Sequence, residues 1–435
     1  MRPFLESVKR FLCKENFDFN RGDIDIYNFH PQLCFLLAIN GIFFKKGVSI
    51  FRYILFNYWP FISLAVGVTA VVVEIMFFSH YLPVQEYSLA MECFYYFMIY
   101  SAIPIVFTSM VVNTSNLHSV IEKMNKDFLV ICELGNREQF LYGQLRIWKM
   151  CAAWFSLVML FCVVFTLFPF IALAYQTLFT TPDENTVRPL MFPVWLPNDD
   201  PYKTPNYEIF LAGETLVVIS FAQTFGVYVY VLFHILMHYY TIVDMIILDF
   251  DVLFEGLEEK VISLSRHDPL RAQVQSELNK RIGKIVKMHQ SVLEAIKTVS
   301  SIYGFPLMYQ VSFSAPIICL AAYEIAEELE KDHIDFFFML LCVGDIIQLW
   351  IVCYLGTIMR NKVFEDACWN CKWHETSLGQ LVRSDIILIL SRAQQPVTIK
   401  FIGLPSVELE TFSLMMARAY SYFNMLRQYT SVKST

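Results

Sequence analysis

The sequence predicts an all-α integral membrane protein with seven transmembrane helices, a cytosolic N-terminus, an extracellular C-terminus and a cytosolic helical anchor domain. Three observations lead to this fold class. The 435 residues are 56% hydrophobic and only 17% charged, whereas soluble domains are about half apolar and a quarter charged. The apolar residues gather in runs longer than the roughly 20 residues that cross a bilayer. Basic residues concentrate in alternate junctions between these runs.

The apolar runs predict seven membrane segments. They cover residues 54–79, 90–112, 152–177, 209–236, 302–323, 336–358 and 410–428. The last segment differs from the others because Arg418, Asn424 and Gln428 interrupt its apolar residues. Polar groups at membrane depth usually face protein or water. We therefore expect the final helix to line a pore, with the rest of the chain as its scaffold.

Lysine and arginine predict the orientation, because they concentrate in cytoplasmic loops. The stretch before the first segment is rich in these residues, as are the junctions after the second, fourth and sixth segments. The other junctions hold only Arg188, Lys203 and Lys331. No secretory signal is evident before the first segment, so we expect the N-terminus inside and, after seven crossings, the C-terminus outside. The outer loops are acidic, either as a solvated face or as a vestibule that concentrates cations.

This pattern divides the chain into six regions. Helical spacing of apolar residues between the fourth and fifth segments indicates that both helices continue into the cytosol. The regions are a cytosolic N-terminal segment (1–51), transmembrane helices one to four (52–250), cytosolic helical extensions (251–299), helices five and six (300–360), a cytosolic anchor region (361–400), and the pore-lining seventh helix with an extracellular tail (401–435).

Motifs for enzymatic or metal chemistry are weak. His234 and His238 stand four apart, a spacing that can bind metal, and Cys368 and Cys371 form a single CxxC near His374. A zinc site needs further ligands, so we expect no metal, no cofactor and no enzyme. Basic residues alternate with hydrophobic blocks, which argues against a nucleic-acid partner.

Aromatic residues crowd the outer half of the second, third and sixth segments. An aromatic pocket with few hydrogen-bonding groups suits a small apolar ligand. Buried carboxylates at Glu74, Glu92, Glu214 and Asp345 are costly unless paired; we expect interhelical hydrogen bonds, with a ligand contact by Glu92 or Glu214 as the alternative. The candidate ligand contacts are Phe94, Tyr95 and Met98 of the second segment, Phe168, Ala172 and Tyr175 of the third, Val218 and Ala222 of the fourth, and Phe337 and Leu341 of the sixth.

The C-terminal third carries a series of residues in the order and spacing of insect odorant receptors. The series is Cys353, Gly356, Ala367, Trp369, Trp373, Leu388, Ala393–Gln394–Gln395–Pro396, Gly403, Phe412 and Tyr420–Ser421–Tyr422–Phe423. The chain resembles this family over its whole length. The resemblance implies a ligand-gated, nonselective cation channel in the plasma membrane of sensory neurons. It also implies a heterotetramer, embedded in membrane lipid, of odorant-binding subunits and a shared co-receptor, with the last helices around a central pore.

The resemblance also assigns parts of the pore. In the run from Tyr422 to Gln428, the gate valine of the co-receptor becomes Met425, and Gln428 takes the polar ring position. Arg427 departs from the pattern, because a cation near the mouth opposes cation entry if all subunits carry it. The chain lacks the co-receptor's long insertion between the fourth and fifth segments, so it resembles a ligand-tuning subunit that binds a small volatile. The alternatives are a gustatory receptor of the same architecture and, less favoured without visible inverted repeats, a membrane transporter.

Overall fold

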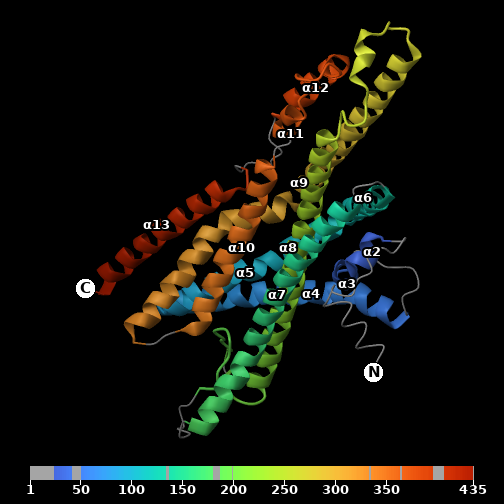
Figure 1. Cartoon of the computed structure of the whole chain (residues 1–435). Coiled ribbons are helices and arrows are strands. Elements are labelled where there is room, and N and C mark those ends of the chain that lie inside the picture. The colour runs from blue at the N-terminus through green and yellow to red at the C-terminus, as the bar shows by residue number, and fades with distance from the viewer. Residues whose placement is uncertain are drawn as a thin grey trace.

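The computed structural model describes residues 24–41, 50–133, 137–179, 187–197, 199–332, 335–362, 365–394 and 406–434. Within these residues the chain forms helices and no strands (Figure 1). Of the predicted regions, residues 1–23, 42–49 and 395–405, the last including Gly403, lie outside the described part. The shorter elements are α2 (Ile26–Phe29), α3 (Pro31–Ile39), α6 (Thr114–Glu133), the 3-10 helix η1 (Glu259–Ser263), α11 (Glu365–Asn370) and α12 (Gly379–Ala393).

Each predicted membrane segment lies within one long helix. These helices are α4 (Ile50–Val84), α5 (Tyr87–Val112), α7 (Arg137–Phe179), α8 (Asn206–Asp251), α9 (Pro269–Glu330), α10 (Phe336–Asn361) and α13 (Leu409–Ser434). Among the described residues, all of these except α13 are long and apolar enough to cross a membrane. α13 does not meet this criterion because Arg418, Asn424 and Gln428 interrupt its apolar residues.

α8 and α9 extend well beyond any bilayer, as the spacing of their apolar residues predicts. The 62 residues of α9 span about 90 Å at 1.5 Å per residue, against about 30 Å for a hydrocarbon core. Asp268 starts the helix, because its carboxylate accepts a hydrogen bond from the Leu270 N–H at 2.9 Å and Pro269 follows it. The Arg281 guanidinium donates to the carbonyls of Val252 and Leu253 at 3.1 and 3.0 Å. It thereby satisfies backbone acceptors at the end of α8.

The N-terminal helices are fixed to the bundle by a buried polar chain. The Ile26 N–H donates to Asn125 Oδ1 at 3.1 Å and so ties α2 to α6. His30 Nε2 lies 3.1 Å from Gln144 Oε1, and Gln144 Nε2 lies 3.1 Å from His238 Nδ1. Because unpaired polar groups are costly inside a protein, these contacts specify how α2 and α3 seat against α7 and α8.

α13 runs along α9 and α10, with its two ends set by ion pairs. Arg360 of α10 pairs with Glu408 just before α13 begins, and Arg427 near the C-terminus pairs with Glu330 at the end of α9. The N-terminal helices and the C-terminus therefore lie at opposite ends of the membrane bundle (Figure 1). This arrangement fits an odd number of crossings; which end faces the cytosol stays a prediction from the charge pattern.

Candidate functional site

A cavity of about 150 Å³ lies between α5, α7, α8 and α10. These are the second, third, fourth and sixth predicted segments. An apolar cavity of roughly this volume stays dry and accepts a molecule the size of benzene. The lining residues are Tyr96, Ile99, Tyr100, Trp154, Leu157, Val158, Phe161, Cys162, Phe165, Phe192, Val218, Phe221, Ala222, Phe225, Gly226, Phe337, Leu341, Gly344, Asp345, Ile347 and Gln348.

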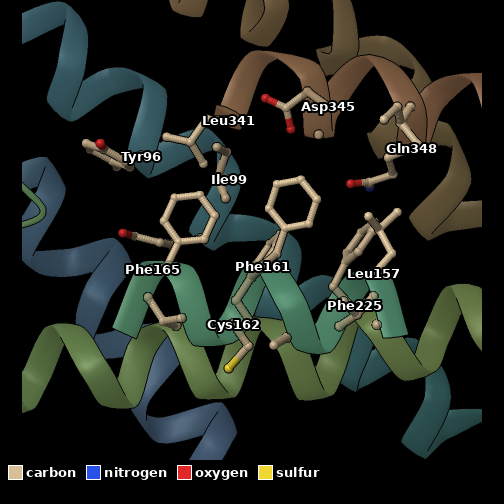
Figure 2. Close-up of a pocket in the computed structure, with 18 of the residues that line it drawn as sticks. Tyr96, Ile99, Leu157, Phe161, Cys162, Phe165, Phe225, Leu341, Asp345 and Gln348 are labelled. Carbon is tan, nitrogen blue, oxygen red and sulfur yellow. The ribbon is translucent and has the colours of Figure 1, made fainter. Parts of the chain in front are cut away.

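α7 supplies one aromatic wall. Leu157, Phe161 and Phe165 recur every four residues and so share one helix face. Figure 2 shows the rings of Phe161 and Phe165 projecting from this face toward Ile99 of α5 and Leu341 of α10. The Phe165 ring meets the Phe337 ring edge-on, with centroids 4.8 Å apart, a geometry that aromatic pairs favour. The helix thus offers an apolar surface to whatever occupies the cavity.

The loop between α7 and α8 closes the cavity near its other aromatic wall. The Phe192 ring lies edge-on to Tyr96 and Tyr100 of α5, at centroid distances of 4.6 and 5.5 Å. The Glu214 carboxylate of α8 accepts hydrogen bonds from the backbone N–H groups of Met191 at 3.0 Å and Phe192 at 3.3 Å. This buried clamp holds the loop where Phe192 can reach the cavity.

Polar groups enter the cavity from α10. Asp345 and Gln348 stand one turn apart on this helix, and both line the cavity (Figure 2). Asp345 Oδ2 accepts a hydrogen bond from the Tyr95 hydroxyl at 3.0 Å. This is the interhelical bond expected for a buried carboxylate. A ligand therefore meets an apolar space with a few oriented polar groups, the usual composition of a small-molecule site.

The structure brings part of the predicted contact set together. Val218, Ala222, Phe337 and Leu341 line the cavity. Tyr95 stands behind the wall through Asp345, Met98 lines a smaller neighbouring cavity of about 50 Å³, and the Phe168 ring packs 5.2 Å from the Phe337 ring. Phe94, Ala172 and Tyr175 lie outside the cavity wall; Tyr175 is 63% exposed near the end of α7.

Sequence reasoning missed the α7 face from Trp154 to Phe165 and the loop residue Phe192. The predicted α7 contacts, Phe168 and Tyr175, lie farther along the helix than the residues that line the cavity. The four-residue repeat of Leu157, Phe161 and Phe165 was a usable signal for α7. Phe192 gives no such signal, because only the fold brings its loop beneath α5.

α13 packs one face on its own chain and leaves the other open. Met415 and Ala419 are buried against α9 and α10, whereas Met425 is 62% exposed and Gln428 is exposed. Leu426, next to Met425, packs against the cluster that contains Phe337 and Tyr96 of the cavity wall. The predicted gate residues thus face away from the subunit, while their neighbour contacts the cavity region.

The loop between α7 and α8 carries fixed negative charge. A hydrogen bond of 2.8 Å from the Asn206 side chain holds the pKa of the exposed Asp199 below its usual value. The Tyr202 N–H, at 2.9 Å, does the same for the pKa of Asp200. Both carboxylates are therefore ionised at neutral pH, which suits a solvated face and an acidic vestibule equally.

Comparison with known proteins identifies the family of this chain. The family model described as 7tm Odorant receptor matches residues 86–420. The chain belongs to the odorant receptor family. This odorant receptor is accordingly a receptor and not an enzyme, and its family agrees with the resemblance carried by the C-terminal series.

Individual relatives of the odorant receptor match over shorter stretches. It is 27% identical over 178 residues to Odorant receptor 85f of Drosophila melanogaster, covering 40% of this chain and 43% of the relative. It is 26% identical over 251 residues to Odorant receptor 2a of Drosophila melanogaster, covering 55% of this chain and 59% of the relative. The matches thus span about half the length of these curated relatives.

Solved structures match almost the whole odorant receptor. The insect olfactory receptor OR5 from Machilis hrabei superposes with a TM-score of 0.63 at 16% identity, covering 92% of this chain and 97% of that one. The same receptor in complex with eugenol superposes with a TM-score of 0.63 at 15% identity. At these identities the likeness concerns the fold, and it confirms the predicted all-α membrane architecture.

Proposed function

We propose that this odorant receptor is the ligand-binding subunit of a heteromeric, ligand-gated, nonselective cation channel in the plasma membrane of sensory neurons, paired with a shared co-receptor. The observation that carries the proposal is the aromatic cavity between α5, α7, α8 and α10, together with the packing of Leu426 of α13 on the apolar cluster to which Tyr96 and Phe337 of the cavity wall belong. The open face of α13 supports a role at a subunit contact or pore.

The ligand is a small, mainly apolar volatile. Burial of its surface contributes roughly 25 cal/mol per Å², and the aromatic rings of Phe161, Phe165 and Phe192 offer that surface from two sides. Asp345 can accept a hydrogen bond from a ligand hydroxyl, and Gln348 can donate to a ligand carbonyl or accept from a hydroxyl. The eugenol complex of the Machilis hrabei receptor supports an aromatic volatile with a polar substituent as the first compound to test.

Gating follows from differential affinity. A ligand shifts the channel toward opening only if it binds the open arrangement more tightly than the closed one. An occupied cavity favours one packing of Phe337 on α10, and Leu426 transmits this packing to α13. Met425 then withdraws from the channel axis and the constriction becomes wet, with Gln428 as a polar ring position.

A paired substitution tests the proposal in cells that coexpress the co-receptor. Leu157→Trp fills the cavity, so we expect whole-cell currents evoked by a panel of volatiles that includes eugenol to fall at least tenfold. Tyr175→Trp is the matched control, because this side chain on the same helix lies outside the cavity wall, and its currents should stay near wild type. Normal current in the Leu157 variant, or an equal loss in both variants, would overturn the assignment.

A further inference from the structure

A second, larger cavity lies behind the wall that Tyr100 and Phe192 contribute to the first. Its volume is about 460 Å³, and α4, α5, α8 and the loop before α8 surround it. Tyr100, Phe192 and Val217 are shared between this cavity and the aromatic cluster around the first. The lining residues are Ile62, Ala65, Val66, Thr69, Ala70, Val73, Glu74, Phe77, Tyr100, Phe192, Pro193, Val194, Ile209, Phe210, Gly213, Glu214, Leu216 and Val217.

Glu74 of α4 gives this cavity a chemistry that the first one lacks. The residue is only 4% exposed, and its Oε2 atom has no hydrogen-bond partner among the described residues. The Tyr100 hydroxyl, on the shared wall, likewise has no partner among them. A buried carboxylate oxygen without a donor is costly. The cavity therefore presents an acceptor that a bound molecule can satisfy.

The second carboxylate of the cavity is already engaged. Glu214 accepts the N–H groups of Met191 and Phe192. Glu74 has the Cys93 thiol beside its carboxyl group, but its Oε2 atom has no partner among the described residues, so Glu74 is the acidic group open to a ligand. The lining holds two carboxylates and no lysine or arginine. A ligand with positive charge and N–H donors complements this wall, whereas a neutral alcohol supplies a donor but no charge.

We propose that this cavity binds a small aliphatic amine in its protonated form, with the ammonium group at Glu74 and the alkyl chain against Val66, Val73 and Val217. Ile62, Ile209 and Leu216 at the rim are 48%, 66% and 42% exposed, so the cavity opens sideways through an apolar mouth that an alkyl chain can pass. Gly213 leaves α8 open here, because a methyl group at this position would meet no atom within 4 Å.

Occupation of the second cavity also bears on the first. An amine seated beside Tyr100 and Phe192 restrains two side chains that line the volatile-binding cavity. The bound amine would thus modulate the response to a volatile and would not take the place of the volatile. This consequence rests on the proposed function, whereas the binding site itself does not.

Photolabelling tests the site without relying on channel current. Membranes from cells that coexpress the receptor and its co-receptor are irradiated with an aliphatic diazirine amine, and the labelled peptides are identified by mass spectrometry. We expect labels within residues 57–84 and 206–217, and competition by n-hexylamine at least tenfold stronger than by 1-hexanol. Equal competition by the two compounds, or labelling only elsewhere, would overturn the proposal.

Two sets of variants test where the ammonium group and the alkyl chain of the amine bind. Glu74→Gln keeps the side-chain size and removes the charge, so competition by n-hexylamine should weaken at least tenfold while currents evoked by neutral volatiles persist. Gly213→Leu should block labelling, and Gly213→Ala, its control, should not. If Glu74→Gln does not reach the cell surface, the glycine pair decides: equal labelling in both variants refutes the site. Normal labelling without any volatile-evoked current would instead refute the proposed function alone.

Discussion

Single side chains in this receptor shape the cavity in two ways. Some line it directly, and others hold the backbone of residues that line it. Glu214 touches no part of the first cavity, yet it holds the N–H groups of Met191 and Phe192 and so places an aromatic ring in the cavity wall. The sequence predicts an interhelical hydrogen bond or a ligand contact for this buried carboxylate, whereas its observed partners are backbone groups of a loop. These partners could not be predicted, because they lie in a loop without a periodic pattern.

Substitution of this clamp should weaken the volatile response without abolishing it. Glu214→Ala removes both acceptors, and hydrogen bonds to charged groups contribute about 1.5–3 kcal/mol. Since the loop is also held by Tyr207, whose hydroxyl donates to the Pro189 carbonyl at 3.2 Å, we expect only part of this loss, a rise of roughly tenfold in the half-maximal volatile concentration. Dose–response curves measure it, with Glu138→Ala at the exposed start of α7 as control. An unchanged curve would show that the clamp does not position Phe192.

At the scale of elements, the sequence predicts where helices lie better than which face they bury. Each of the first six predicted apolar runs lies within one long helix, namely α4, α5, α7, α8, α9 or α10. Within α5, however, apolar residues surround the helix on all sides, so no polar stripe marks the outward face. Phe94 and Tyr96 are therefore equally plausible wall residues from sequence alone, although Tyr96 lines the cavity and Phe94 packs outward on Phe78.

Two helical glycines should respond to the same substitution in opposite directions. Gly283 of α9 has no atom within 4 Å of an added methyl group, so Gly283→Ala should stabilise the helix by about 0.5–1 kcal/mol. A methyl group at Gly356 of α10 would lie 1.8 Å from the Val407 carbonyl oxygen, at the entrance to α13. Gly356→Ala should therefore destabilise the receptor. Thermal unfolding of the purified complex compares the two, and a destabilised Gly283 variant would contradict the helical assignment there.

The contact between α9 and α13 also explains how an arginine can be accepted near the mouth of the proposed cation pathway. Glu330 pairs with Arg427 and offsets its charge. Glu330→Gln should leave this cation uncompensated and reduce the single-channel cation conductance, and Arg427→Gln in the same chain should restore it. The pair is exposed, so little change in stability is expected. Conductance that is the same in all three proteins would place Arg427 away from the ion path.

For the whole molecule, the two termini lie at opposite ends of the bundle, as an odd number of crossings requires. The N-terminal helices seat against α6 and α7 through Asn125 and Gln144, while Arg427 holds the other terminus beside Glu330 at the opposite end of the bundle. The family, the helices and the four-helix surroundings of the cavity follow from sequence. The wall itself depends on how four apolar helices rotate against one another, which composition does not encode.

Accessibility of α13 tests the central claim that ligand binding in the subunit cavity opens a path beside this helix. Gln428→Cys is coexpressed with the co-receptor, and a membrane-impermeant thiol reagent is applied from outside with and without an activating volatile; the parent chain serves as control. The account predicts an irreversible fall in current that develops faster when the volatile is present, with no change in the parent. A current that resists the reagent in both conditions, in cells where the variant responds normally, would contradict the account.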